Sequence, residues 1–339
     1  MPVRMKDIAR ELGVSVVTVS KVLRNHSDIS EETRQRVLKR MKELHYRPNL
    51  AARALITGKT FTMGLIVPDL LHPFFAQVAK ALSGVIRPRG YSLILSSSEE
   101  DPELEKQELE MLLTRRVDAI LIASAQWTVE SFRQIEDQQI PYVLIDRKFV
   151  GLAANFVGVN DEAAGMLATG HLIEQGCRRI AHIRGPEVST AIGRAGGYRL
   201  ALAQHGLTPL PGYVISMGAS GDARGEAGGY EATRTLLGMD ERPDGVFCYN
   251  DPTAMGAMHA ILDAGLRIPE DIAVVGCGNI HYSDFLRVPL TTVDQNSESI
   301  GERAAELALA LIGAKKPVRP SIISIEPTLV VRASSQRRA

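Results

Sequence analysis

The chain contains 339 residues, 45% of them hydrophobic and 23% charged, with 39 basic and 39 acidic side chains. This length predicts roughly two or three domains, and no apolar run approaches the ~18 residues of a membrane span, which excludes a membrane-spanning class. The three cysteines, Cys177, Cys248 and Cys277, are too far apart for a metal-binding C-x-x-C motif and indicate free thiols in a reducing cytoplasm.

Basic residues are concentrated at the start of the chain. Residues 1–60 contain 13 Lys and Arg against 6 Asp and Glu, so they carry a net charge of +7 and the remaining residues carry −7. A basic module can neutralise phosphates and release counterions, which gives a salt-sensitive affinity for DNA. Charge alone is also compatible with a solvated basic face. The first ten residues contain no apolar secretion signal, which predicts a cytoplasmic protein.

Residues 8–23 have the spacing of a helix-turn-helix motif. Ala9 is small where two helices cross, Gly13 lies where the turn requires a positive φ, and Ser15 can cap the second helix. The inward positions of both helices are apolar: Ile8, Leu12, Val14, Val19 and Val22. This pattern and the local charge together predict a DNA-binding headpiece over residues 1–48.

A third helix is expected to begin after Ser30, a plausible N-cap, and to run to about His45. Pro48 ends it, because the residue before proline is disfavoured in a helix. Asn49 can cap a short helix over residues 50–55. So short a helix is unstable in water, since nucleation costs more than two turns return. We therefore expect the hinge segment, residues 49–60, to fold only against a partner.

From residue 61 onward, apolar strands alternate with amphipathic helices. Strands are expected at 63–67, 92–96, 119–123, 142–145, 156–159, 179–183, 214–216, 246–249 and 273–276. This alternation predicts an α/β core of two parallel-sheet subdomains with a ligand cleft at the carboxyl ends of the strands. The tail is expected to cross between them, which assigns 61–159 and 292–320 to the first subdomain and 160–291 and 321–339 to the second.

Several motifs recur in a known family. They are Lys6-Asp7-Ile8-Ala9, Gly13-Val14-Ser15, Thr18-Val19-Ser20, Tyr46-Arg47-Pro48-Asn49, Ala52-Arg53-Ala54-Leu55, Gly64-Leu65-Ile66-Val67-Pro68-Asp69, His171-Leu172-Ile173, Asn250-Asp251 and Pro289-Leu290-Thr291-Thr292-Val293. In these motifs the sequence resembles the LacI/GalR (lactose/galactose repressor) family over nearly its whole length. The resemblance implies a homodimeric transcription regulator, most often a repressor, with a helix-turn-helix headpiece, a hinge helix and a periplasmic-binding-protein-like core that binds a small-molecule effector.

The resemblance also implies that the second helix enters the major groove of operator DNA. Val16, Val17 and Lys21 match the family's base-reading positions. Valine can contact a thymine methyl group and lysine can donate to guanine, although one of the valines could instead pack on the first helix. Phosphate contacts, which fix register, are expected from Ser15, Thr18 and Asn25.

The hinge segment matches the family's minor-groove element. Leu55 is expected to wedge between base pairs at the centre of a pseudo-palindromic operator, where an apolar side chain can kink the duplex. Ala52 and Arg53 would lie beside it, and Asn49 would begin the helix. The resemblance therefore implies that two copies of the chain bind double-stranded DNA together.

The effector cleft is expected to be lined by side chains from loops and helices of both subdomains. They are Asp69, His72, Phe74, Asp146, Arg147, Arg194, Asn250, Asp251, Asn279 and His281. Asp251 could instead cap its helix, and Phe75 is expected in the core. Family members commonly place an aspartate after the strand ending at Gly276, where this chain has Gly278. Because that carboxylate is missing and Arg147, Arg194 and His281 lie nearby, the cleft is expected to favour a ligand that carries a carboxylate, such as a sugar acid. A sugar is the other effector class considered.

No catalytic residue, metal site or cofactor is expected. Gly58-Lys59-Thr60 resembles the end of a phosphate-binding P-loop, but Arg53 occupies the position of the required first glycine. The expected partners are operator DNA, the effector and a second copy of the chain, with no membrane. Two alternatives remain: a cytoplasmic sugar-binding protein without a regulatory role, and an α/β enzyme such as a sugar kinase or dehydrogenase.

Overall fold

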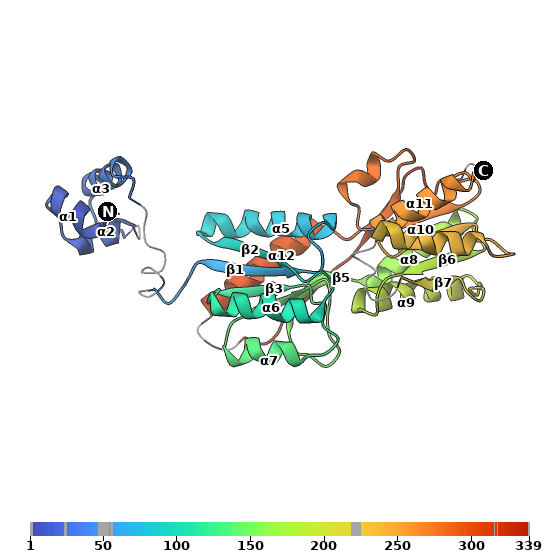
Figure 1. The fold of residues 1–339 in the computed structure, drawn as a ribbon, viewed down its shortest axis with the longest axis horizontal. Helices are drawn as coiled ribbons and strands as arrows, with labels where there is room; N and C mark the ends of the chain where they lie inside the picture. The colour runs from blue at the N-terminus through green and yellow to red at the C-terminus, as the bar shows by residue number, and fades with distance from the viewer. Residues whose placement is uncertain are drawn as a thin grey trace. The chain divides into compact units, whose positions relative to one another are not determined.

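A computed structural model describes residues 3–23, 26–46, 54, 57–217, 225–314, 316 and 318–337. The chain divides into two compact units, Met1–Thr60 and Phe61–Ala339, which are described separately below (Figure 1). Within the described residues, no helix combines the length and the apolar character needed to cross a membrane.

The headpiece consists of three helices: α1 (Met5–Leu12), α2 (Val16–Leu23) and α3 (Glu31–Glu43). Gly13 ends α1 with φ 64°, as its predicted turn position requires. The predicted caps are confirmed, because Ser15 Oγ accepts the Thr18 N–H at 2.9 Å and Ser30 Oγ accepts the Thr33 N–H at 3.3 Å. The three helices enclose a small apolar core of Ile8, Ala9, Val19, Val22, Val37 and Met41.

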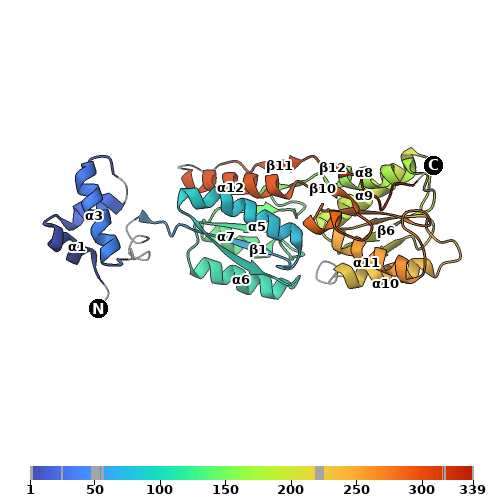
Figure 2. The ribbon, with the colours of Figure 1, turned by 90° about the horizontal axis from the view of Figure 1, so that it is seen from above.

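The first lobe of the second unit is built on a six-stranded sheet with the strand order β2-β1-β3-β4-β5-β11. Its strands are β1 (Thr62–Val67), β2 (Ser92–Ser97), β3 (Ala119–Ile122), β4 (Tyr142–Ile145), β5 (Asn155–Val159) and β11 (Ile322–Ile325). Helices α5 (Pro73–Ile86) and α12 (Ser297–Gly313) cover one face of this sheet. The 3-10 turn η1 (Arg87–Arg89) directly follows α5. Helices α6 (Pro102–Thr114) and α7 (Glu130–Asp137) cover the other face (Figures 1 and 2).

The second lobe repeats this architecture with the strand order β7-β6-β8-β9-β10-β12. Its strands are β6 (Ile180–Arg184), β7 (Val214–Ser216), β8 (Gly245–Cys248), β9 (Ala273–Cys277), β10 (Thr291–Asp294) and β12 (Thr328–Val330). Helices α8 (Asp161–Glu174) and α9 (Ser189–Gln204) pack on one face. Helices α10 (Gly225–Leu237) and α11 (Asp251–Asp263) pack on the other, and the 3-10 turn η2 (His281–Asp284) follows β9.

The chain crosses between the lobes three times, after β5, after β10 and after β11. The tail therefore crosses as predicted, but at different residues. β10 pairs with β9 through residue 293 and with β12 through residue 294, so the second lobe continues past the predicted boundary at 292. β11 pairs with β5, so the first lobe continues past the predicted boundary at 321. An apolar run predicts a strand but does not identify the sheet that it joins.

Candidate ligand cleft and DNA-contacting helix

Helix α2 presents two valines to solvent. Val16 is 44% exposed and Val17 is 61% exposed, whereas Val19 and Val22 are buried in the headpiece core. Neither exposed valine belongs to the apolar core of the headpiece. Lys21 follows Val17 by one helical turn and shares its face. The exposed face of α2 therefore has an apolar pair at its start and a lysine in its last turn.

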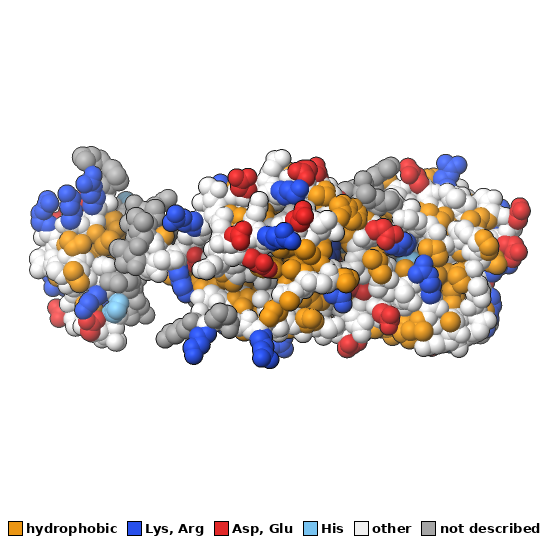
Figure 3. Space-filling view, turned by 90° about the horizontal axis from the view of Figure 1, so that it is seen from below, with side chains coloured by type: hydrophobic (Ala, Val, Ile, Leu, Met, Phe, Trp, Pro, Cys, Tyr) orange, Lys and Arg blue, Asp and Glu red, His pale blue; other side chains and the backbone are white. Residues whose placement is uncertain are grey.

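Of the seven other residues predicted to contact DNA, the structure describes two. Ser15 and Thr18 lie at the start of α2, where their side-chain oxygens are 2.9 Å apart. The remaining five lie outside the described residues: Asn25, Asn49, Ala52, Arg53 and Leu55. On the face shown in Figure 3, Lys and Arg side chains gather at one edge of the headpiece.

The two lobes meet at a narrow cleft near the carboxyl ends of their strands. Eight side chains from both lobes line it: His72, Phe74, Phe75, Asp146, Arg194, Tyr249, Asn250 and Gln295. Five of these were predicted, and they lie together here. The space between them is about 10 Å3, room for roughly one water molecule. A larger ligand therefore requires the lobes or side chains to move.

Two helix caps from different lobes face each other in this cleft. His72 Nδ1 accepts the Phe74 N–H at 3.3 Å and caps α5, while Asn250 Oδ1 accepts the Thr253 N–H at 2.9 Å and caps α11. Burial lowers the pKa of His72 to about 4, so the ring is neutral at pH 7. Because Nδ1 accepts, the ring hydrogen is on Nε2, which lies 3.2 Å from Asn250 Nδ2. Two donors therefore face each other.

Arg194 reaches the cleft from α9. Its Nε donates to Asp161 Oδ1 at 2.9 Å and its Nη1 donates to the Tyr249 carbonyl at 2.7 Å. The guanidinium carbon also lies 4.8 Å from the centre of the Tyr249 ring. Close packing of α8 and α9 positions this arginine, because a Cβ on Gly165 would lie 2.1 Å from the Arg194 carbonyl oxygen. Burial lowers the pKa of Arg194, but Cys277, Asp161 and Asp146 together outweigh this effect, so the pKa is raised and the side chain stays charged.

Arg147 is buried but does not line the cleft. It donates to both carboxylate oxygens of Glu100, at 2.9 Å from Nη1 and 2.5 Å from Nη2, and to the Ser124 carbonyl at 3.2 Å. Glu100 therefore pairs with one of the two arginines that were expected to attract an anionic effector, and Asp161, whose pKa burial raises to about 7, pairs with the other. Each arginine therefore already has a carboxyl partner within its own lobe.

Two further polar side chains, Asp146 and Gln295, line the cleft. Asp146 is 6% exposed and its carboxyl group lines the cleft; burial raises its pKa, and Arg194 opposes this rise. Gln295 is 3% exposed, and its Nε2 is buried without a hydrogen-bond partner among the described residues. A buried donor without a partner is costly. Sequence reasoning missed Gln295, although its place directly after β10, at a strand end, follows the rule used for the others.

The other predicted cleft residues have different surroundings. Asp69 accepts the Leu71 N–H at 2.8 Å in the loop after β1, and His281 is exposed on η2. Asn279 donates to Asp294 at 2.9 Å. The cap of α11 is Asn250, so Asp251 does not have the alternative role considered for it.

The carboxylate of Asp251 fastens the loop that follows β9. It accepts the Ile280 N–H at 2.9 Å and the Ser283 hydroxyl at 2.8 Å through Oδ2, and the Thr292 hydroxyl at 2.5 Å through Oδ1. The side chain is fully buried. Asp251 therefore supports the cleft wall without lining it.

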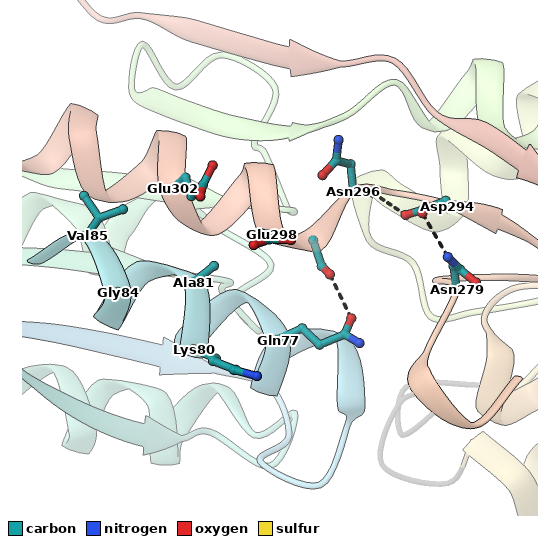
Figure 4. Close-up of a pocket in the computed structure, with 11 residues that line it drawn as sticks. Gln77, Lys80, Ala81, Gly84, Val85, Asn279, Asp294, Asn296, Glu298 and Glu302 are labelled. Carbon is teal, nitrogen blue, oxygen red and sulfur yellow. Dashed lines mark hydrogen bonds between the residues drawn. The ribbon is translucent and has the colours of Figure 1, made fainter. Parts of the chain in front are cut away.

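A second hollow, of about 610 Å3, lies between α5, the start of α12 and the end of β10 (Figure 4). Several of its polar groups bond to one another. Ser297 donates to Gln77 at 2.8 Å, and Asp294 accepts from the Asn296 N–H at 2.7 Å and from Asn279 at 2.9 Å. The smaller cleft contains the unpartnered Gln295 donor and is therefore the stronger candidate for a ligand site.

Two protein-family models match separate parts of the chain, and known repressors match nearly all of it. Residues 4–49 match the family described as bacterial regulatory proteins, lacI family, and residues 169–335 match the periplasmic binding protein-like domain. The HTH-type transcriptional repressor PurR of Histophilus somni (strain 129Pt) is 35% identical, over 97% of this chain and 98% of that protein. The PurR repressor of Pasteurella multocida (strain Pm70) is 36% identical, over 98% of this chain and 99% of that protein.

Solved structures match the whole chain as well. The lac repressor dimer bound to operator and the anti-inducer ONPF aligns with a TM-score of 0.85 at 26% identity, covering 99% of this chain and 100% of that one. The transcriptional regulator CelR–cellobiose complex aligns with a TM-score of 0.74 at 28% identity, covering 98% and 99%. With its helix-turn-helix headpiece and its two-lobed core, this chain belongs to the lacI family of bacterial regulatory proteins.

Proposed function

We propose that the chain is a repressor that binds a pseudo-palindromic operator as a homodimer in the cytoplasm and responds to a small neutral effector in the cleft between its lobes. The relatives are named transcriptional repressors, and the matched lac repressor structure is a dimer on its operator. The regulated genes would belong to carbohydrate metabolism. The observation that carries the effector proposal is the buried Gln295 Nε2, a donor in the cleft that has no hydrogen-bond partner among the described residues.

The headpiece supports the DNA-binding part of the proposal. Val16 and Val17 are exposed at the start of α2, where apolar side chains can contact thymine methyl groups. Lys21 lies on the same face and can donate to guanine. The net charge of +7 in residues 1–60 favours a polyanion. The hinge contacts of Asn49, Ala52, Arg53 and Leu55 remain predictions, since these residues lie outside the described ones.

The cleft favours a ligand with both acceptor and donor groups. His72 Nε2 and Gln295 Nε2 are donors, while Asp146 offers an acceptor. A hydroxyl group can accept from the first two and donate to the third. The rings of Phe74 and Tyr249 provide apolar surface for the faces of a ring-shaped ligand. A sugar has all of these features.

Charge weighs against the sugar acid that the sequence also suggested. Arg147 and Arg194 are already paired with Glu100 and Asp161, so a ligand carboxylate would have to compete with these partners for both arginines. Asp146 would lie beside such a carboxylate, and bringing two carboxyl groups together disfavours ionisation of both, which weakens the binding of an anionic ligand. We therefore propose a neutral sugar as the effector class.

Matched ligand pairs test the effector class. Calorimetry should compare neutral sugars with the uronic and aldonic acids derived from them, on the full-length protein. The proposal predicts heat of binding for a neutral sugar and much weaker binding of its acid. Tight binding of the acid alone would contradict the neutral-ligand proposal.

Selection of binding sites from a random duplex library tests the regulatory part. A repressor of this kind should enrich a twofold-symmetric sequence and lose affinity steeply as salt concentration rises. An absence of any enriched sequence would favour a sugar-binding protein without a regulatory role. Sedimentation equilibrium would show whether a dimer forms at the concentrations used.

A further inference from the structure

Asp28 lies in the loop between α2 and α3, and its carboxylate forms an ion pair with Lys21 of α2. We infer that Asp28 is a positioning residue that fixes where Lys21 reads the DNA and so sets the sequence specificity of the headpiece. This inference rests on the proposed DNA-binding function of α2. Asp28 lies outside α2, the helix that the sequence pattern assigned to base contact.

The ion pair is placed where it can affect recognition. Lys21 shares the exposed face of α2 with Val17, which precedes it by one turn. Among the ion pairs of the described headpiece residues 3–23 and 26–46, this is the one that reaches α2. The others lie within α1, within α3 or between these two helices: Arg10–Asp7, Arg34–Glu31, Arg40–Glu43 and Arg40–Glu11.

The loop that carries Asp28 is attached to α3 on both sides. Arg34 Nη2 donates to the His26 carbonyl at 2.7 Å, and Ser30 caps α3 through the Thr33 N–H at 3.3 Å. Asp28 lies between these two attachments. Its hydrogen bond with Lys21 lowers the pKa of the carboxyl group, which is therefore charged at neutral pH. Lys21 thus faces an acceptor at a fixed position.

A restrained ammonium group reads DNA differently from a free one. Lysine carries three donors on a flexible stem, and an unrestrained lysine can reach whichever phosphate is nearest. Phosphate contacts carry no sequence information. Asp28 engages one donor and repels phosphates, so the other donors of Lys21 are directed to base edges such as guanine O6 and N7. The pair thereby reduces non-specific attraction and favours discrimination.

The experiment compares Asp28→Asn with Glu32→Gln in the full-length protein. Both variants remove one negative charge from the headpiece, but Glu32 is exposed in the first turn of α3 and has no ion pair with α2. Each protein is used to select sites from a random duplex library. Its affinity for the wild-type selected site and for an unrelated duplex is then measured by fluorescence anisotropy over a range of salt concentrations.

We expect Asp28→Asn to bind the unrelated duplex more tightly and to lower the ratio of specific to non-specific affinity about tenfold. Its selected site should lose preference at the base pair that Lys21 reads. Glu32→Gln should select the wild-type site and keep the wild-type ratio. In a Lys21→Met background, Asp28→Asn should cause no further loss of the ratio.

Equal effects of Asp28→Asn and Glu32→Gln would overturn the inference, because general electrostatics would then explain the change. An undiminished effect of Asp28→Asn in the Lys21→Met background would overturn it as well. A wild-type protein that selects no sequence would contradict the proposed function of α2 itself. Matching melting temperatures of the variants would exclude unfolding as the cause of lost binding.

Discussion

His72 and Asn250 cap helices in different lobes, and their side-chain nitrogens lie 3.2 Å apart across the cleft. Each side chain uses its other polar atom for its own helix, so the orientation of both is fixed by local structure. The two groups that meet are donors. An acceptor between them would join the lobes, which gives a physical reason for a ligand oxygen to stabilise one arrangement of the lobes.

We predict that Asn250→Asp joins the lobes without a ligand. Aspartate can keep the cap of α11 and also offers an acceptor to His72 Nε2. The adjacent anion should raise the pKa of His72 above its value of about 4. An NMR titration of the histidine ring resonances measures this pKa. Asn160→Asp, at the cap of α8, is the control and should leave the pKa of His72 where it was. An unchanged pKa in Asn250→Asp would refute the contact.

We predict that Gln295→Leu stabilises the ligand-free protein while weakening effector binding. Removing a buried donor that has no partner should add about 1 kcal/mol to the free energy of unfolding. Gln126→Leu is the control, because Gln126 Nε2 donates to the Pro102 carbonyl at 2.6 Å and its loss should destabilise. Urea unfolding and calorimetry measure the two effects. A destabilised Gln295→Leu protein would mean that the amide already has a partner.

His182 should make the protein sensitive to mild acid. The ring is fully buried between Tyr198 and Phe247, and burial lowers its pKa from 6.5 to about 4. Between these two pH values the unfolded chain binds a proton that the folded chain does not, so stability is complete above pH 6.5 and is lost as the pH falls toward 4. The full loss is about 3 kcal/mol.

The measurement is urea unfolding at pH 7 and pH 4.5 for the wild type and His182→Phe. Phenylalanine keeps the ring stacking but cannot bind a proton. The variant should lose about 2 kcal/mol less than the wild type on acidification. Its stability at pH 7 is not the readout, because the Phe247 carbonyl also loses its partner. Equal losses in both proteins would show that His182 is not the group responsible.

Arg4→Thr should stabilise the headpiece. Arg4 is at the N-cap position of α1 without a side-chain cap bond, while Asp7 already accepts the Arg4 N–H at 2.9 Å. Threonine would complete this reciprocal pair, and a cap contributes about 1 kcal/mol. Hydrogen exchange of the α1 amides should slow roughly fivefold in Arg4→Thr. Arg4→Ala removes the same charge without providing a cap, so similar slowing in both variants would contradict the capping explanation.

The sequence predicted features that depend on neighbours along the chain. Gly13, Ser15 and Ser30 act within one helical turn of themselves, and the expected strands appear because apolar runs are local as well. Partners distant in sequence were not predictable in this way. Arg147 and Arg194 were both read as free cations, but Glu100 and Asp161 meet them only in the folded lobes.

Two features of the cleft show the same limit. Asp251 was considered as a ligand contact or a cap, yet its carboxylate is used by a loop some thirty to forty residues later in the chain. Gln295 lies at a strand end, but its importance rests on the lack of a partner for Nε2, which depends on everything packed around it. A pattern of residue types does not show which buried donors will lack a hydrogen-bond partner in the folded chain.

The central claim is that a ligand in the cleft between the lobes changes the affinity of the headpiece for its operator. The direct measurement is the operator dissociation constant of the wild type and Gln295→Leu, with and without the neutral sugar identified by calorimetry. We predict a change of at least about tenfold in the wild type and a much smaller one in Gln295→Leu. An operator affinity that the bound sugar leaves unchanged in the wild type would contradict the claim.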